Sequence, residues 1–182
     1  MFERDYTICG RHATYIKYLV NDAKVFERYI DVYMTAAAIG CLYDKIGSEM
    51  PSNDRARIYA DAFSTEREKC MELFRTVILA DRSKTWSHEE RINICFRYRD
   101  EKMENTVPSI TDEELSIMKE AMELFNSYVL GGIELLYDSF YSPTINEDDA
   151  IDFAYKMVFD QYSLIESQQG DLDVGQLFRP EY

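Results

Sequence analysis

FERYIDVYMTAAAIGCLY, residues Phe26 to Tyr43, is the segment that decides the fold predicted by this sequence. Its second half, Val32 to Tyr43, has no charged residue and combines large apolar side chains with a Thr, a Gly and three consecutive Ala. A membrane-spanning helix needs about twenty apolar residues, so this run is too short to cross a bilayer. A helix that is apolar nearly all round is instead surrounded by other protein. We therefore predict a central buried helix near 22–46.

Apolar periodicity and capping signals predict further helices along the chain. A Ser or Thr followed three residues later by Glu is a capping box, which satisfies backbone N–H groups at a helix start. The first such pair would either divide a helical region that begins at Ser52 or Asn53, or lie inside one long helix. The three pairs are Thr65 with Glu68, Ser87 with Glu90, and Thr111 with Glu114.

Paired glycines interrupt the apolar stripe of the helix that follows Thr111. Glycine costs roughly 1 kcal/mol relative to Ala inside a helix, so Gly131 and Gly132 need a compensating contact. The small residues Ala36 to Gly40 are the candidate for that close approach. No segment alternates like a strand, and we predict an all-α, single-domain bundle of about six helices over 1–182. An alternative subdivision has a charge-balanced part at 1–100, an acidic part at 110–170 and an extended tail at 171–182.

Composition supports a globular chain of one domain. The 182 residues are 46% apolar, 14% aromatic and 30% charged, which is typical of a solvated exterior on a packed core. The four cysteines stand far apart without a Cys-x-x-Cys spacing, so we expect free thiols. The charged N-terminal residues MFERDYTICGRH contain no apolar run, and they predict a cytoplasmic protein without a signal peptide.

Charge is distributed unevenly along the chain. Residues 1–100 hold sixteen Lys and Arg and sixteen Asp and Glu, whereas the remaining 82 residues hold four and eighteen. The whole formal charge of −14 therefore lies in residues 101–182. Such a surface repels nucleic acid and membrane headgroups and attracts basic partners, so direct binding of nucleic acid or of a membrane is not expected.

Metal and catalytic motifs are sparse. The only two histidines, His12 and His88, do not form the Glu-x-x-His pairs of a di-metal helical bundle, and we expect no cofactor. One alternative remains, a Mg²⁺-dependent all-α enzyme acting on a diphosphate or nucleotide. Carboxylates one helical turn apart can share a hard cation. The residues offered for that role are Asp148, Asp149 and Asp152, with Glu120 and Glu123 as a second pair.

Repeated acidic residues on the C-terminal helices favour a different function, a non-enzymatic protein-binding module. We expect these helices to dock on a basic, nucleic-acid-handling protein, either as an accessory subunit or as an inhibitor that mimics nucleic acid. Anti-CRISPR proteins are an analogy from charge and size alone. The residues predicted for the acidic face are Glu113, Glu114, Glu120, Glu123, Asp148, Asp149 and Asp152.

Overall fold

The computed structural model describes residues 1–49, 52–98 and 111–141, together with Asp152, Tyr155, Lys156, 158–160 and Ser163. The chain forms two compact units, Met1–Tyr141 and Ser142–Tyr182. Most described residues are helical, which confirms a predominantly α-helical protein. Among the described residues, no helix has the length and apolar character that crossing a membrane requires.

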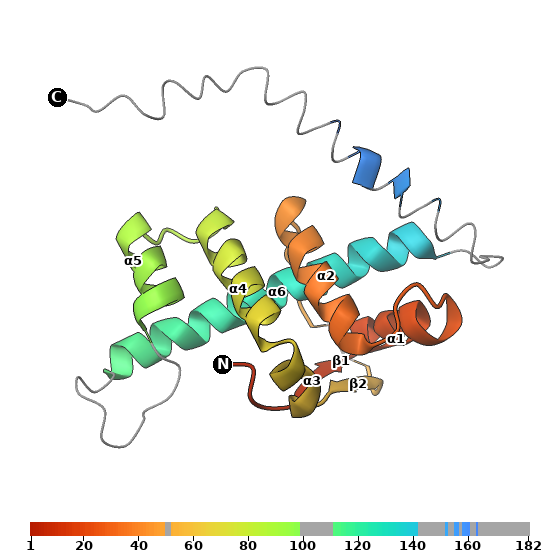
Figure 1. The fold of residues 1–182 in the computed structure, drawn as a ribbon, viewed down its shortest axis with the longest axis horizontal. Coiled ribbons are helices and arrows are strands. Elements are labelled where there is room, and N and C mark those ends of the chain that lie inside the picture. The colour runs from red at the N-terminus through yellow and green to blue at the C-terminus, as the bar shows by residue number, and fades with distance from the viewer. Residues whose placement is uncertain are drawn as a thin grey trace. The chain divides into compact units, whose positions relative to one another are not determined.

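Helices of the first unit are arranged along one long helix, α6, as Figure 1 shows. Two short stretches, η1 and η2, are π-helical and directly continue α1 and α5. The most extensive contact in this unit is between α2 and α6. In chain order the elements are β1 (Tyr6–Cys9), α1 (Arg11–Lys17), η1 (Tyr18–Asp22), α2 (Tyr29–Leu42), β2 (Arg55–Ile58), α3 (Ala60–Thr65), α4 (Arg67–Ala80), α5 (His88–Ile92), η2 (Asn93–Arg97) and α6 (Asp112–Phe140).

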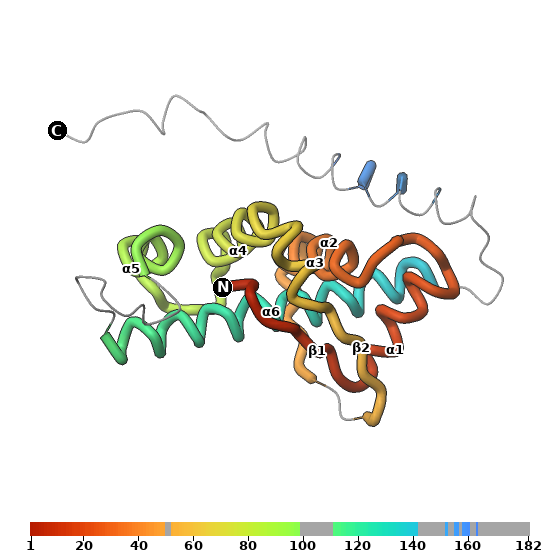
Figure 2. Tube along the Cα trace, turned by 60° about the horizontal axis from the view of Figure 1, so that its bottom comes forward, coloured from red at the N-terminus to blue at the C-terminus, as the bar shows by residue number. Residues whose placement is uncertain are grey.

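A two-stranded sheet shows that the prediction of no strands was wrong. β1 and β2 pair antiparallel, with Tyr6 opposite Ile58 and Cys9 opposite Arg55. Within β2 the burial alternates, because Ala56 and Ile58 point inward and the two arginines point outward. Four residues are too few for this period to stand out in a sequence, and the pairing partner lies about fifty residues away along the chain. Figure 2 shows the N-terminal segment leading into this sheet beside α6.

The central helix α2 is shorter than the predicted 22–46. It begins after Arg28, whose extended backbone places its N–H 3.1 Å from the Asp31 carboxylate in a capping box. The chain before it turns at Lys24, which has a φ of 53°. Beyond the last helical turn, Asp44 takes a left-handed conformation with a φ of 50°, and this ends the helix before the predicted stop.

Contact with the small residues of α2 is confirmed for Gly132, whereas Gly131 faces the backbone carbonyl of Lys45, beyond the end of α2. A Cβ atom added at Gly132 would overlap the backbone carbonyl of Ala36, and one at Gly40 would overlap that of Tyr128. Ala36 and Ala37 have no exposed surface. The two helix backbones therefore approach more closely than any larger side chain permits.

Three further helix boundaries were predicted from capping signals, and the boxes at Ser87 and Thr111 form. The helical region predicted from Ser52 begins only at Ala60, after the strand β2, and it is divided, since α3 ends at Thr65 and α4 begins after Glu66. The capping box at Ser87 forms, with the Glu90 N–H 3.2 Å from the Ser87 hydroxyl. The box that opens α6 forms in the same way at Thr111 and Glu114.

A buried carboxylate, Asp81, ties α6 to α4 and α5. Its Oδ1 accepts hydrogen bonds from the Tyr128 hydroxyl at 2.8 Å and the Ser83 hydroxyl at 2.6 Å, while Oδ2 lies 3.4 Å from Arg91. Burial by itself would raise the pKa of Asp81, but hydrogen bonds from Ser83, Tyr128 and the Lys84 amide outweigh it and hold that pKa below its usual value. Arg91 also donates to the Ile78 carbonyl at 2.5 Å.

The second unit is described at seven helical positions. All seven are exposed. Val158 is 70% exposed. Within its own unit, no other described element lies against it. Tyr155 and Phe159 stack on one another with ring centroids 6.1 Å apart.

Enlarging a side chain at the α2–α6 contact should destabilise the first unit. Ala37→Leu places extra methylene groups where Ala37 has no exposed surface, so we expect a loss of roughly 1–3 kcal/mol in the free energy of unfolding. Urea unfolding measures this. Ala38→Leu is the matched control, because Ala38 is exposed on the same helix turn and should change stability by less than about 0.5 kcal/mol. Equal stability of the two variants would contradict the contact.

Protonating Asp81 should destabilise the fold at low pH. The pKa of Asp81 is depressed in the folded state, so its contribution is present above the unfolded pKa of about 3.9 and is lost as the pH falls through the folded value. Asp81→Ala should cost about 3 kcal/mol at neutral pH, because Arg91 then loses its buried carboxylate.

Unfolding in denaturant between about pH 6 and about pH 3 measures both effects. The Asp81→Ala variant should lose less of its remaining stability on acidification than the parent protein. Asp22→Ala, at an exposed site in η1, is the control and should follow the parent curve. An Asp81→Ala variant with the acid sensitivity of the parent would contradict the role of this carboxylate.

Candidate partner-binding groove

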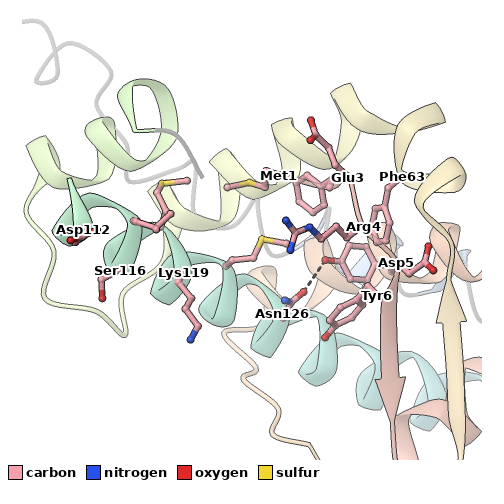
Figure 3. A pocket seen from close by; sticks show the side chains of 15 residues that line it. Met1, Glu3, Arg4, Asp5, Tyr6, Phe63, Asp112, Ser116, Lys119 and Asn126 are labelled. Carbon is pink, nitrogen blue, oxygen red and sulfur yellow. Dashed lines mark hydrogen bonds between the residues drawn. The ribbon is translucent and has the colours of Figure 1, made fainter. Parts of the chain in front are cut away.

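An open groove lies between the N-terminal segment and the first half of α6 (Figure 3). Its volume is about 750 Å³. Apolar side chains supply most of the lining, and charged groups lie among them. The lining residues are Met1, Phe2, Glu3, Arg4, Asp5, Tyr6, Tyr33, Phe63, Asp112, Leu115, Ser116, Met118, Lys119, Met122 and Asn126.

Helix α6 contributes one long stripe to this groove. Asp112, Leu115, Lys119, Met122 and Asn126 follow each other in steps of three and four residues, so they lie along one side of the helix. None of the five is fully buried. The core face of α6 is a separate stripe that packs on α2 and α4, and its side chains at 121, 125 and 129 have no exposed surface. The groove therefore uses a second face of the same helix, on which Leu115 and Met122 are the apolar side chains.

The opposite wall of the groove is the N-terminal segment, held in place by Phe2. Its ring stacks on Phe63 with centroids 5.7 Å apart and meets the edge of Phe125 at 5.9 Å. Phe2 has a φ of 58°, which is unfavourable for a bulky side chain and persists only where packing compensates for it. Burial of the Phe2 ring thus holds the N-terminal segment in its position opposite α6.

Two ion pairs fasten the same wall on its outer side. Glu3 lies 2.6 Å from Arg67, and Asp5 pairs with Arg57. Asp5 also accepts a hydrogen bond from the Ala60 N–H at 2.7 Å. That backbone bond, and then the Arg57 pair, lower the pKa of Asp5. Both acids of the wall are therefore already paired with neighbouring arginines.

Two tyrosines give the groove a neutral polar end. The Tyr33 hydroxyl donates to Oδ1 of Asn126 at 2.8 Å, and Figure 3 shows this bond as a dashed line. Burial raises the pKa of Tyr33 well above its usual value and that of Tyr6 to about 12, so both hydroxyls stay neutral. Oδ1 of Asn126 accepts this hydrogen bond. The side-chain NH2 group of Asn126 can therefore donate to a ligand in the groove.

Acidic residues predicted for the docking surface have different surroundings in the structure. Glu113 is exposed, and Glu123, with a side chain 69% exposed, lies 4.0 Å from Lys119. Glu114 caps its own helix, and Glu120 pairs with Lys84 at 2.6 Å. Asp152 is exposed in the second unit, and Asp148 and Asp149 lie outside the described residues.

Another acidic residue of α6, Glu134, is only 17% exposed. It lies 3.0 Å from the ring of the fully buried His12 and 3.4 Å from Lys45. This contact turns His12 toward α6. Glu134 therefore pairs with groups inside the first unit and adds little negative charge to the surface.

The magnesium alternative depends in part on Asp148 and Asp149, which lie outside the described residues. Within the described ranges, no three His, Cys, Asp or Glu side chains come together to hold a metal ion. Glu120 pairs with Lys84 at 2.6 Å and Glu123 lies 4.0 Å from Lys119, so each member of that pair already has a cation beside it. The remaining carboxylates of this alternative are those at 148, 149 and 152, of which only Asp152 is described.

Several cations of the region 82–97 are used for structural contacts. Arg91 is buried against Asp81 and three backbone carbonyls, and Lys84 pairs with Glu120. Arg97 donates to the Asn93 side chain at 2.8 Å. These contacts engage cations that nucleic-acid binding would otherwise require.

The groove itself was not predicted from the sequence. Leu115 and Met122 belong to the apolar stripe of the helix that follows Thr111, and that stripe was not divided into a face packed on the core and a face left open. The sequence does contain a signal for the groove. It is the second stripe in steps of three and four residues, from Asp112 to Asn126, which lies about one residue away from the stripe that packs on the core.

Comparisons of this chain with protein-family models, with curated proteins and with solved structures gave no match.

Proposed function

We propose that this protein is a non-enzymatic binding module that docks on a basic, nucleic-acid-handling protein, as an inhibitor or an accessory subunit. The observation that carries the proposal is the composition of α6. That helix contains seven acidic residues and a single cation, Lys119, and its solvent side borders the groove. Such a surface attracts basic partners and accelerates their encounter.

The negative net charge of both units also supports docking on a basic partner. Residues 1–141 hold eighteen Lys and Arg and twenty-five Asp and Glu, so the formal charge of −14 is shared equally at −7 per unit. An acidic protein of this kind competes with nucleic acid for basic surfaces. Glu113 and Glu123 are the predicted docking residues that remain most exposed on α6.

Reversing the exposed charges on α6 should weaken partner binding. Glu113→Lys combined with Glu123→Lys removes the attraction and adds repulsion, and we expect at least a tenfold loss of partner retained, about 1.4 kcal/mol. The measurement is capture of the partner from the source cells on the immobilised full chain, followed by its identification. Repeating it at about 0.1 M and about 1 M salt shortens the Debye length from about 10 Å to about 3 Å.

The matched control is Glu68→Lys combined with Glu72→Lys. Both residues are exposed on α4, are one helical turn apart, and give the same change in net charge. This control should retain the partner as the parent protein does. Binding that resists high salt, or that both double variants weaken equally, would contradict docking through α6.

A further inference from the structure

The groove stripe on α6 has the spacing of a helix-pairing seam. Asp112, Leu115, Lys119, Met122 and Asn126 occupy alternating three- and four-residue steps, the pattern by which one helix receives the side chains of another. From Asp112 to Asn126 this stripe extends about 21 Å, or about four helical turns. Its length therefore matches a partner helix of about fourteen residues.

The side chains that line the groove favour binding of apolar side chains from a partner. Met1, Met118 and Met122 line it together with Leu115. Methionine side chains are flexible and polarisable, and they line surfaces that accept varied helical ligands. Phe63 and Tyr33, both nearly without exposed surface, close the floor. A side chain of leucine or methionine size can thus be buried there.

The wall opposite α6 is formed before any partner arrives. Phe2 is 6% exposed, and the pairs of Glu3 with Arg67 and Asp5 with Arg57 hold the segment on either side of Arg4. A preformed site avoids the cost of ordering a loop on binding.

Charge next to the stripe selects the sign of the partner helix. Glu123 lies one turn beyond Lys119 toward solvent, and Glu113 directly follows Asp112. The side chain of Lys119 is 80% exposed and is the only cation that α6 contributes. A docked helix would face these acids along its flank, so Lys and Arg on that flank are complementary.

We propose that this groove binds an amphipathic, basic α-helix, inserting apolar side chains at three- and four-residue spacing between α6 and the N-terminal segment. The inference rests on the proposed function, because it names the part of the basic partner that is recognised. It adds an apolar anchor to a contact that charge steers and that high salt still weakens.

The direct test uses a fluorescein-labelled synthetic helix of Leu and Lys with amphipathic spacing, titrated with the full chain and followed by anisotropy. Two peptides serve as probes of the alternatives, one with Glu in place of Lys and one with the same Leu and Lys in scrambled order. We expect the amphipathic basic peptide to bind at least tenfold more tightly than either. Equal binding of the scrambled peptide, or of the Glu peptide, would overturn the inference.

Variants of the full chain localise the contact. Met122→Lys and Leu115→Lys should each weaken binding of the basic peptide at least tenfold, whereas Lys119→Glu should tighten it. Leu79→Lys, at an apolar side chain on α4 that is 46% exposed and outside the groove, is the control and should leave binding unchanged. Circular dichroism and thermal unfolding confirm that each variant is folded, and two groove variants at different turns keep the test decisive.

Failure of this inference can be told apart from failure of the proposed function. If Met122→Lys and Leu115→Lys retain the cellular partner while the Glu113→Lys and Glu123→Lys double variant loses it, the acidic surface stands and the groove is excluded. If a helix of the partner binds in the groove, all three variants lose the partner. If the double variant retains the partner and Met122→Lys loses it, docking through charge is excluded and the groove contact remains.

Discussion

The first unit depends on one steric constraint, the near contact of two backbones where α2 crosses α6. Gly40 faces the carbonyl of Tyr128 and Gly132 faces that of Ala36, so neither position has space for a Cβ atom. Backbones this close bring the flanking side chains into full contact. Tyr33 is therefore buried with its ring 5.9 Å from that of Phe125, and its hydroxyl reaches Asn126 at the end of the groove. The packing that builds the core also fixes the polar end of the candidate site.

A second constraint, the buried carboxylate of Asp81, holds α6 from its other side. The Tyr128 hydroxyl lies 2.8 Å from Asp81 and 3.1 Å from Asp44, so one proton is shared between carboxylates after α4 and after α2. Burial, and then the bond to Asp81, raise the pKa of Tyr128 and keep that proton in place. With α6 fixed on both sides, the groove along its first half is a property of the fold, which lowers the cost of binding.

Local signals in the sequence predicted the parts of this fold that depend on neighbouring residues. The capping boxes at Ser87 and Thr111 formed because each needs only a hydroxyl and a carboxylate three residues apart. The glycine contact was also predictable, since a pair such as Gly131 and Gly132 is costly without a close neighbour. β1 and β2 were missed because each has four residues and its partner is distant in the chain. The groove was missed because helical spacing alone does not separate a stripe that packs on the core from one that stays open.

Counting charges along a chain overstates an acidic surface, because it ignores what each carboxylate contacts. On α6, Glu114 caps the helix, Glu120 is paired with Lys84, and Glu134 faces the interior beside His12. Glu113 and Glu123 remain exposed next to the groove. Exposed charges in water contribute little affinity individually, and their main effect is on encounter and orientation. A tight contact on this face therefore needs burial of apolar surface as well, and Leu115 and Met122 are the half-exposed apolar side chains on the groove stripe of α6 that can supply it.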